Sequence, residues 1–263
     1  MGTTPSQPRK ETLHVITQSL QLLTINAGQP EKVLQRVGLS GLAVGDQLVG
    51  MDYRVNKGVL FALSRSGRVY TINTDSGVLT PLGVAPIATT LEGSVFGFDF
   101  NPAADRIRVV SNTGQNLRLH PDTGALVATD TPLAYEPGDT QAGNTPNLAA
   151  AAYTYNKTNE KLTTNYAVDL RAGMLVRQGS LEGVQPSVSP NTGRLFTVGP
   201  LGTGALSDIT MDIADTTGVA FAALQTTPRG AVKLYTIALE SGKAELLGTI
   251  TAGEGLVGIA VIP

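Results

Sequence analysis

The sequence contains no cysteine and no tryptophan, and it is poor in charged residues. Without cysteine, the chain of 263 residues has no disulfide, no thiol nucleophile and no thiolate-bound zinc. This absence leaves the cellular compartment open, because a cysteine-free protein is stable in either redox environment. A chain of this length buries roughly 70–75% of its unfolded surface, so a hydrophobic core suffices for stability.

An excess of charge of one sign is also missing. The 19 Lys and Arg residues nearly balance the 21 Asp and Glu residues, and charged residues make up 15% of the chain, against about 25% in ordinary globular domains. This balance argues against a nucleic-acid-binding protein, which normally has a basic stripe, and against a polybasic membrane anchor. No uninterrupted apolar run exceeds six residues, whereas a membrane-spanning helix needs about 20. We therefore expect no nucleic-acid partner and no membrane span.

The first ten residues, MGTTPSQPRK, contain no apolar stretch and do not form a signal peptide. We expect residues 1–10 to be a disordered leader, followed by a single domain over residues 11–263. The expected location is periplasmic or extracellular if a signal peptide has been trimmed.

Five short segments of the chain resemble one another. They cover residues 49–53, 96–100, 149–153, 209–213 and 257–261, and each begins with an apolar residue. We use the fourth residue of each segment as a marker; the markers are residues 52, 99, 152, 212 and 260. Successive markers are 47, 53, 60 and 48 residues apart. Repeats of roughly 40–50 residues built from short strands are typical of a β-propeller.

Each repeat contains further short strands. In the second unit, Val59–Ser64, Arg68–Asn73 and Val78–Gly83 alternate apolar and polar residues, and the turns between them contain glycine near their ends. Alternation of this kind predicts strands, and glycine supplies the positive φ that tight turns need. Four strands joined by tight turns form an antiparallel sheet. No stretch of the sequence combines a sustained 3.6-residue hydrophobic period with helix-capping residues, so we expect almost no helix.

The two ends of the chain complement each other. The first unit supplies three strands, over 12–18, 20–26 and 32–38, and lacks an opening strand. The last segment, 255–262, supplies only an opening strand. If this strand pairs with the first unit, the ring closes and few edges stay exposed. The predicted fold is all-β: a five-bladed β-propeller of four-stranded antiparallel blades, closed by the C-terminal strand pairing with the N-terminal blade.

Three of the five markers are aspartates, Asp52, Asp99 and Asp212, and the other two are Ala152 and Ala260. The inner strands of a propeller line its channel, so these carboxylates are expected to converge. Hard oxygen ligands suit Ca²⁺ or Mg²⁺, and clustered carboxylates raise one another's pKa unless a cation neutralises them. The alternative, which we favour, is that each aspartate caps a turn or pairs with an arginine.

A second candidate is a group of arginines on two adjacent strands. Arg106 and Arg108 share one face of their strand, and Arg118 lies on the next strand. Guanidinium groups bind carboxylate or phosphate through paired donors, so a small anion or an acidic glycan is a candidate ligand. The favoured alternative is neutralisation of the arginines between blades by Asp99, Asp105 and Asp130.

Two long segments interrupt the repeat, over residues 131–147 and 179–193. Loops longer than about 12 residues are usually functional or disordered. The first segment contains polar candidates whose oxygens could bind Ca²⁺ over one end of the channel, although a solvated loop is the favoured interpretation. These candidates are Tyr135, Glu136, Asp139 and Asn147.

Long stretches of the chain are similar to one known family. The block GFDFNPAADRIRVVSNTGQNLRLHPDTGALVATD, residues 97–130, is followed by LAYEPGD and AGNTPNLAAAAYT. Together with RVYTINTDSGVLTPLG and TVGPLG, this resembles the family called domain of unknown function 4394. The resemblance implies a bacterial protein, usually exported, and implies no activity.

Catalytic motifs are missing from the sequence: there is no G-x-S-x-G elbow, no H-E-x-x-H pair and no glycine-rich phosphate loop. We therefore favour a non-catalytic binding or scaffold module, monomeric, for an unknown small molecule or protein, with no required cofactor other than the Ca²⁺ or Mg²⁺ considered above. One alternative is a hydrolase or lyase that acts at the channel mouth with Asp and Arg residues and a divalent cation. The other is a structural platform for partners in a surface assembly.

Overall fold

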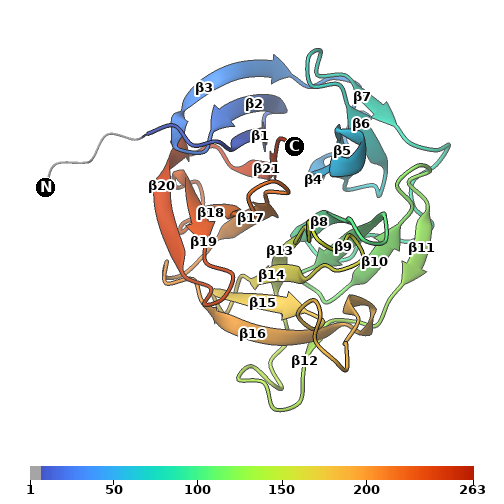
Figure 1. Ribbon diagram of the computed structural model, residues 1–263. Coiled ribbons are helices and arrows are strands. Elements are labelled where there is room, and N and C mark those ends of the chain that lie inside the picture. The colour runs from blue at the N-terminus through green and yellow to red at the C-terminus, as the bar shows by residue number, and fades with distance from the viewer. Residues whose placement is uncertain (1–6) are drawn as a thin grey trace, which may run out of the picture.

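The computed structural model describes residues 7–263 and shows five small sheets arranged as a ring (Figure 1). The prediction of a five-bladed β-propeller is confirmed. Each blade runs from an inner strand near the axis to an outer strand at the rim, and strands that are neighbours in a blade are antiparallel, with one exception at the edge of blade four.

Each blade is built, from the axis outwards, of the following strands. Blade one contains β21 (Leu256–Val261), β1 (Thr12–Thr17), β2 (Gln21–Asn26) and β3 (Gln29–Gly38). Blade two contains β4 (Leu48–Arg54), β5 (Val59–Ser64), β6 (Val69–Ile72) and β7 (Leu79–Pro81). Blade three contains β8 (Phe96–Asn101), β9 (Arg106–Ser111), β10 (Asn116–Leu119) and β11 (Leu126–Thr129). Blade four contains β13 (Leu148–Tyr153), β14 (Asn165–Asp169), β15 (Met174–Gln178), β16 (Arg194–Pro200) and β12 (Ala134–Tyr135). Blade five contains β17 (Asp208–Ile213), β18 (Ala220–Gln225), β19 (Val232–Ile237) and β20 (Ala244–Thr251).

The C-terminal strand closes the ring, as the sequence predicts. β21 pairs antiparallel with β1, with Leu13 opposite Val261 and Ile16 opposite Gly258. The first blade therefore takes its inner strand from the last residues of the chain and its other three strands from the first 38. This pairing removes the free edge that β1 would otherwise expose.

Blade four departs from the expected four strands. The sequence predicts a loop without strands over 131–147, but this segment contains β12, which pairs in parallel with the outer strand β16 through Ala134–Arg194 and Tyr135–Leu195. The sequence does not indicate this strand, because two residues are too few to show the alternation of apolar and polar side chains that predicts a strand.

The inner strands approach one another closely because glycine lies two residues before the marker in three of them. A Cβ atom at Gly50 would lie 2.6 Å from the Cβ of Phe98 in the next blade. At Gly97, a Cβ would lie 2.7 Å from the backbone of Ala150. Any larger residue would push these blades apart, so the glycines determine how tightly the inner strands pack around the axis.

The hydrophobic core lies between the blades. Each pair of neighbouring blades encloses one cluster of buried apolar side chains. In the described part of the chain, the cluster between blades three and four has eight buried members, whereas the other four have 11 to 14. The interface between blades three and four therefore depends less on apolar packing than the other interfaces do.

Helical structure in residues 7–263 is limited to two short 3₁₀ turns, η1 (Val55–Lys57) and η2 (Pro190–Thr192). No helix in this part of the chain has the length and apolar character needed to cross a membrane. The expected leader lies mostly outside the described residues, which begin at position 7. Arg9 is hydrogen-bonded to blade one, because its backbone N–H donates to Asn26 Oδ1 over 2.8 Å.

Candidate functional site

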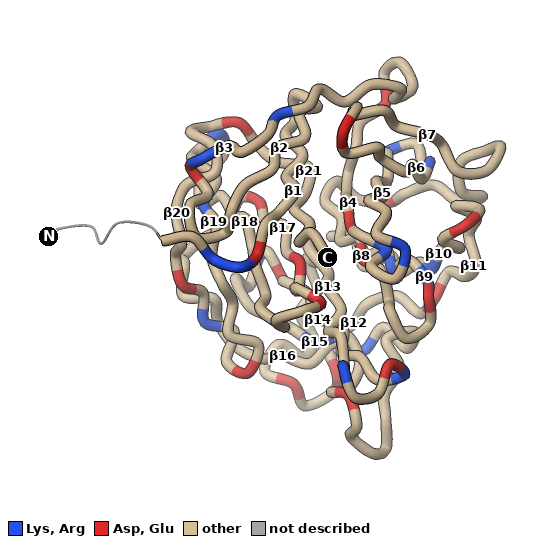
Figure 2. Tube along the Cα trace, turned by 45° about the horizontal axis from the view of Figure 1, so that its top comes forward, with Lys and Arg blue, Asp and Glu red and all other residues tan. Residues whose placement is uncertain are grey.

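The three marker aspartates meet at the axis of the ring. Asp52 on β4, Asp99 on β8 and Asp212 on β17 each place one carboxylate oxygen within 4.8 Å of the other two. Their exposed fractions are only 3%, 2% and 6%. Figure 2 shows acidic positions on inner strands near the centre of the ring. We call these three residues the Asp triad.

Each member of the Asp triad accepts a backbone hydrogen bond from the blade that follows it around the ring. Phe100 N–H donates to Asp52 over 2.8 Å, and Tyr153 N–H donates to Asp99 over 3.0 Å. Val261 N–H, on the closing strand, donates to Asp212 over 2.6 Å. The carboxylates thus bridge neighbouring blades at the axis.

The two blades that follow an alanine marker are capped differently. Ala152 and Ala260 provide no acceptor, so the N–H groups of Ile213 and Tyr53 would lack a partner from the preceding blade. Instead, Ile213 N–H donates to the second oxygen of Asp212 over 2.6 Å, and Tyr53 N–H bonds to Asp52. Three carboxylates therefore satisfy the N–H groups of five inner strands. A buried N–H left without a partner would cost free energy.

Burial and mutual repulsion disfavour the charged forms of the triad. Burial, and then the charge of Asp212, raises the pKa of Asp52 well above its usual value. Burial, followed by the charges of Asp52 and Asp212, does the same for the pKa of Asp99. Burial raises the pKa of Asp212 to about 7. In residues 7–263, no Lys, Arg or His forms an ion pair with these carboxylates.

The triad has the donor chemistry for a hard cation, since Ca²⁺ and Mg²⁺ both take carboxylate oxygens. Ca²⁺ needs six to eight oxygen ligands, however, which is more than three side chains readily supply. The oxygens of the triad already accept five N–H groups, whose dipoles supply part of the positive charge that a cation would supply. We therefore interpret the triad as a set of acceptors for backbone N–H groups. The raised pKa values of its carboxyl groups favour their protonated forms.

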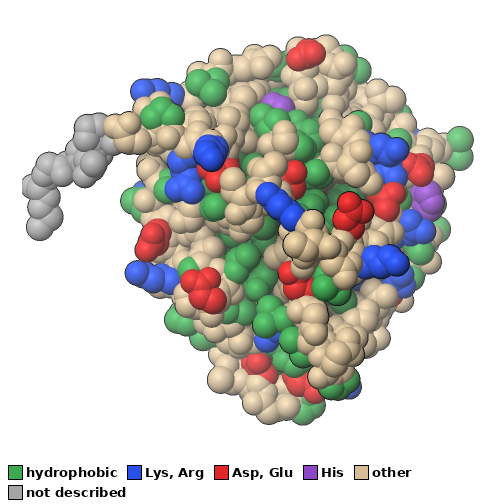
Figure 3. All heavy atoms as spheres, in the orientation of Figure 1, with side chains coloured by type: hydrophobic (Ala, Val, Ile, Leu, Met, Phe, Trp, Pro, Cys, Tyr) green, Lys and Arg blue, Asp and Glu red, His purple; other side chains and the backbone are tan. Residues whose placement is uncertain are grey.

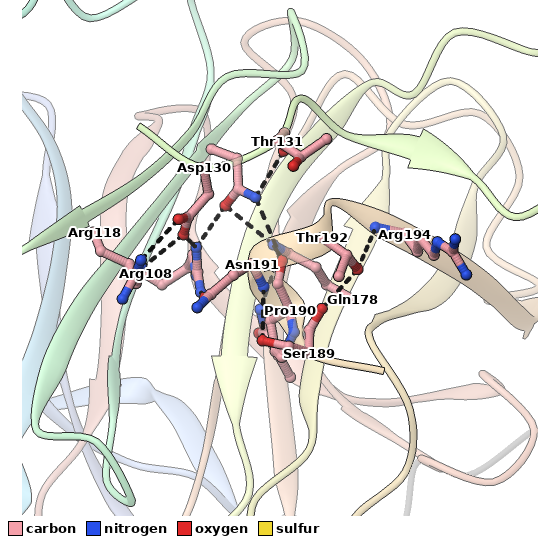
Figure 4. Close-up of polar contacts among 12 residues, drawn as sticks. Arg108, Arg118, Asp130, Thr131, Gln178, Ser189, Pro190, Asn191, Thr192 and Arg194 are labelled. Carbon is pink, nitrogen blue, oxygen red and sulfur yellow. Dashed lines mark hydrogen bonds and ion pairs between the residues drawn. The ribbon is translucent and has the colours of Figure 1, made fainter. Parts of the chain in front are cut away.

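The three candidate arginines line one cleft at the interface between blades three and four, and Figure 4 shows two of them, Arg108 and Arg118. Arg108 and Arg118 face each other across β9 and β10, and both pair with Asp130, over 2.6 and 2.8 Å respectively. Arg108 has an exposed fraction of 2%. The three guanidinium groups thus line one cleft, and Asp130 pairs with two of them.

Amide side chains complete the surroundings of Arg108. Its Nη1 donates to Asn116 Oδ1 over 2.7 Å, and its Nη2 donates to Asn191 Oδ1 over 2.6 Å. Gln178 of blade four donates to Asn116 over 3.1 Å. We call Arg108, Arg118, Asp130 and these three amides the arginine network; Figure 4 shows how it joins β9 and β10 to β15 and the loop after it.

The other two acidic residues expected to neutralise the arginines do not do so. Asp99 belongs to the Asp triad at the axis. Asp105 pairs instead with Arg54 of blade two, with a distance of 2.9 Å between Arg54 Nε and its Oδ1. Counting of charges along strands could not predict these partners, because both depend on contacts between different blades.

The long segment 131–147 lies at the outer edge of blade four (Figure 1). Tyr135 donates to Asp169 over 2.6 Å, and Asp139 accepts from the N–H and hydroxyl of Thr197. Glu136 pairs with Arg194. The pairing of β12 with β16, the next strand inwards, places the start of this segment at the rim of the ring and not over the channel.

Asn147 lies at the inner end of the same segment, directly before β13. Its backbone N–H donates to Asp169 over 3.1 Å. The four loop candidates thus lie along blade four, and their side chains and backbone bind other residues of that blade, apart from one backbone hydrogen bond from Asp139 to Glu136 over 2.9 Å. They do not form a common site for a cation.

A funnel of about 690 Å³ opens at the end of the ring where the inner strands begin. Leu48, Phe96, Asp208 and Leu256, at the starts of four inner strands, line it. Gln225 and Arg229 of blade five also contribute to its wall. The Asp triad lies towards the other ends of three of these strands, β4, β8 and β17, so the funnel and the triad are separate features of the axis.

Several residues of these sites escaped sequence analysis. Asp208 opens β17, and burial raises its pKa. Tyr155 follows β13, where burial and then the charges of Asp52 and the other axial carboxylates raise the pKa of its hydroxyl. Tyr155 lies three residues after the marker Ala152, and no other repeat has a tyrosine at that offset. Comparison of the repeats therefore does not single out Tyr155, and the same holds for Asn191 and Gln178.

The face of the ring that Figure 3 shows carries charged side chains of both signs, scattered among hydrophobic ones, with no large field of one sign. This agrees with the small net charge of the chain. The site features are therefore local clusters and not part of a broad charged surface.

The fold is similar to that of solved structures. A chain in the crystal structure of a nidogen/laminin complex matches with a TM-score of 0.53 at 9% identity, covering 96% of this chain and 98% of that one. Glutaminyl cyclase from Myxococcus xanthus matches with a TM-score of 0.49 at 12% identity, covering 93% and 97%. An auxiliary nutrient binding protein from Bacteroides ovatus matches with a TM-score of 0.49 at 12% identity, covering 89% of this chain and 53% of that one. At these identities, the first match supports the fold alone.

No curated protein matches the sequence. The model of one protein family, described as domain of unknown function (DUF4394), matches residues 21–260. That range covers all five blades apart from β1 and the last residue of β21. The chain belongs to the domain of unknown function 4394 family, as the resemblance of its central block indicates.

Proposed function

We propose that the protein is a non-catalytic binding module that takes a small polar molecule into the funnel. The observation that carries this proposal is the funnel itself, whose volume of about 690 Å³ falls within the roughly 300–1,000 Å³ of small-molecule sites. It lies at the axis, where segments from different blades contribute to one concave wall.

The wall of the funnel combines apolar surface with a few polar groups. Phe96, Leu256 and Val257 supply apolar area. Asp208 supplies a carboxylate whose Oδ1 accepts the N–H of the adjacent Ile209 over 2.9 Å. In residues 7–263, no cation forms an ion pair with Asp208. A ligand with a hydrogen-bond donor or an amine would satisfy this carboxylate.

Arg229 provides the complementary group at the funnel. It is exposed and lies in the turn between β18 and β19, with a positive φ of 60°. Its guanidinium suits an acidic or carbonyl group of a ligand whose donor end reaches Asp208. The chemistry of the wall therefore favours a molecule with both donor and acceptor groups.

The lining also favours binding over turnover. Among the described residues that line the funnel there is no histidine, lysine or tyrosine. The acidic residues of the wall are Asp46 and Asp208, and Asp46 already accepts hydrogen bonds from the N–H and hydroxyl of Ser66. The serines and the threonine of the wall therefore have no histidine or lysine base beside them, which supports the non-catalytic alternative.

The test is a thermal-shift screen of the full chain against amino acids, sugars and small organic acids, since a specific ligand raises the melting temperature. Hits are then titrated by calorimetry against Asp208→Asn, with the exposed Asp75→Asn as control. We expect Asp208→Asn to weaken binding and Asp75→Asn to leave it unchanged. Conversion of a hit to product, detected by mass spectrometry, or equal binding by both variants would contradict the proposal.

We also propose that the protein acts outside the cytoplasm, as the family resemblance implies. Fractionation of the source cells with an antibody against the chain tests this. Recovery from the periplasm or the medium supports an exported module, and recovery with cytoplasmic markers contradicts it.

A further inference from the structure

A second, smaller cleft lies between blade three and the loop 179–193 of blade four. Its volume is about 180 Å³, and its lining includes Arg106, Arg108, Arg118, Tyr153, Ser189 and Asn191. Asn101 and Tyr153, the last residues of two inner strands, place it at the opposite end of the ring from the funnel. An inference about this cleft is therefore independent of the function proposed for the funnel.

The cleft carries more positive than negative charge. Three guanidinium groups line it, and Asp130 is the one carboxylate that pairs with any of them in residues 7–263. Arg106 uses Nη1 to donate to the backbone carbonyl of Asp105 over 2.7 Å. Both oxygens of the Asp105 carboxylate accept from Arg54, and among the described residues this carboxylate forms no ion pair with Arg106. Three cations against one paired anion leave an excess of positive charge at the cleft.

The arginines differ in how many donors they have free for a ligand. Arg108 is buried, and all three of its guanidinium nitrogens donate within the protein: Nε to Tyr153, Nη1 to Asn116 and Asp130, and Nη2 to Asn191. Arg118 donates to Asp130 with Nε and Nη2, which leaves Nη1 for another acceptor. Arg106 retains Nε and Nη2. Both side chains are partly exposed.

We propose that this cleft binds a small oxyanion of the phosphate or carboxylate class. Arg106 and Arg118 donate hydrogen bonds to it, and Arg108 acts as a positioning residue that fixes Asp130 and Asn191 and adds charge. Planar guanidinium groups match carboxylate and phosphate oxygens with paired donors. The volume of about 180 Å³ is below the range of drug-sized sites, so the ligand is a small ion or the charged end of a larger molecule.

The experiment is calorimetric titration of the full chain with inorganic phosphate and, separately, with acetate, at constant ionic strength. We expect saturable binding of at least one of the two anions. Arg106→Gln should weaken it about tenfold or more, since hydrogen bonds to charged groups are worth about 1.5–3 kcal/mol. The exposed Arg171→Gln, in the turn between β14 and β15, is the matched control and should bind like the unaltered protein.

Two further measurements keep the test decisive. The backbone amide chemical shifts of Ser189 and Asn191 should change on addition of the anion that binds. Asp208→Asn should bind this anion normally, which separates a failure here from a failure at the funnel. If Arg106→Gln does not fold, Arg118→Lys replaces it, because lysine retains the charge and loses the planar paired donors. Absence of saturable binding of both anions, or equal binding by Arg106→Gln, would overturn the proposal.

Discussion

The Asp triad and the arginine network are both buried polar clusters, but they differ in how the free-energy cost of buried charge is reduced. The triad gathers three carboxylates with backbone N–H donors and no counter-charge in the described chain. The arginine network matches each carboxylate oxygen of Asp130 with a guanidinium and surrounds Arg108 with amides. The first cluster reduces its charge by keeping protons, and the second by pairing ions.

The position of each cluster explains the difference. At the axis, the five-fold repeat brings the same backbone N–H group from every blade to one place, so acceptors alone are needed there. Between blades three and four, the apolar cluster is the smallest of the five, and large polar side chains fill the remaining volume. The network therefore also contributes packing, because the aliphatic part of arginine covers apolar surface.

The largest effect is expected from Arg108→Met. This change leaves the buried carboxylate of Asp130 with only the partly exposed Arg118, and it removes one hydrogen-bond partner from each of Asn116, Asn191 and Tyr153. Breaking one side of a buried ion pair typically costs about 3–5 kcal/mol. Urea unfolding should show a loss of this size, with Arg171→Met changing little. A loss below about 1 kcal/mol would show that the network does not hold the two blades together.

A smaller effect is expected from Asp99→Ala, measured near pH 4 where repulsion within the triad is weakest. The change leaves the buried N–H of Tyr153 without its acceptor, which costs about 1–3 kcal/mol. Asp99→Asn retains an oxygen at the same place and is the matched control. Equal stability of the two variants would contradict the role of the triad as a backbone acceptor.

The pH dependence separates the two clusters further. The folded-state pKa values of the triad are raised, to about 7 for Asp212 against 3.8 for a free side chain, so the folded protein holds protons that the unfolded chain releases in this window. The contribution of the triad to the free energy of unfolding is therefore fully present below about pH 4 and falls as the pH rises towards 7 and above.

Asp99→Asn should therefore be more stable relative to the unaltered protein at pH 8 than at pH 4, by about 1 kcal/mol or more. Comparison of the two proteins cancels the opposing effect of His14, whose pKa burial lowers to about 4. Urea midpoints at both pH values provide the measurement. If the two proteins differed in stability by the same amount at pH 4 and at pH 8, Asp99→Asn would not relieve repulsion among the carboxylates of the triad, and the prediction would be contradicted.

The smallest effect is expected from a divalent cation. Because the triad already accepts five N–H groups and retains protons, addition of Ca²⁺ at pH 8 should shift the melting temperature less than Asp99→Asn does. Asp99→Asn with Ca²⁺ serves as the control for non-specific effects. A saturable shift larger than that of the substitution would identify the triad as a cation site instead.

The repeat explains why the sequence predicts so much of the fold. Markers every 47 to 60 residues predict five blades and the closing strand, and the same markers bring Asp52, Asp99 and Asp212 together. The partners that lie outside the repeat could not be predicted. β12 is too short for periodicity, and Arg54 pairs with Asp105 and Asp122 only because two blades meet at that place.

The lining of the funnel could not be predicted from the sequence either. Its lining residues come from turns and strand starts of several blades, and each of them is ordinary in its own segment. Asp208 is distinguished from other acidic residues by partial burial without an ion-pair partner in the described chain, which depends on the packed ring. The candidate sites in this protein therefore lie in contacts between blades, which the repeat positions but does not specify.

The most direct measurement is a titration of the aspartate side-chain carboxyl carbons by NMR, with assignments from Asp52→Asn, Asp99→Asn and Asp212→Asn. We predict that Asp52 and Asp99 titrate well above the usual range and that Asp212 titrates near 7. If all three carboxyls ionise at or below about pH 4, a counter-charge must neutralise them, and the description of the axis as a proton-holding cap for five strands would be contradicted.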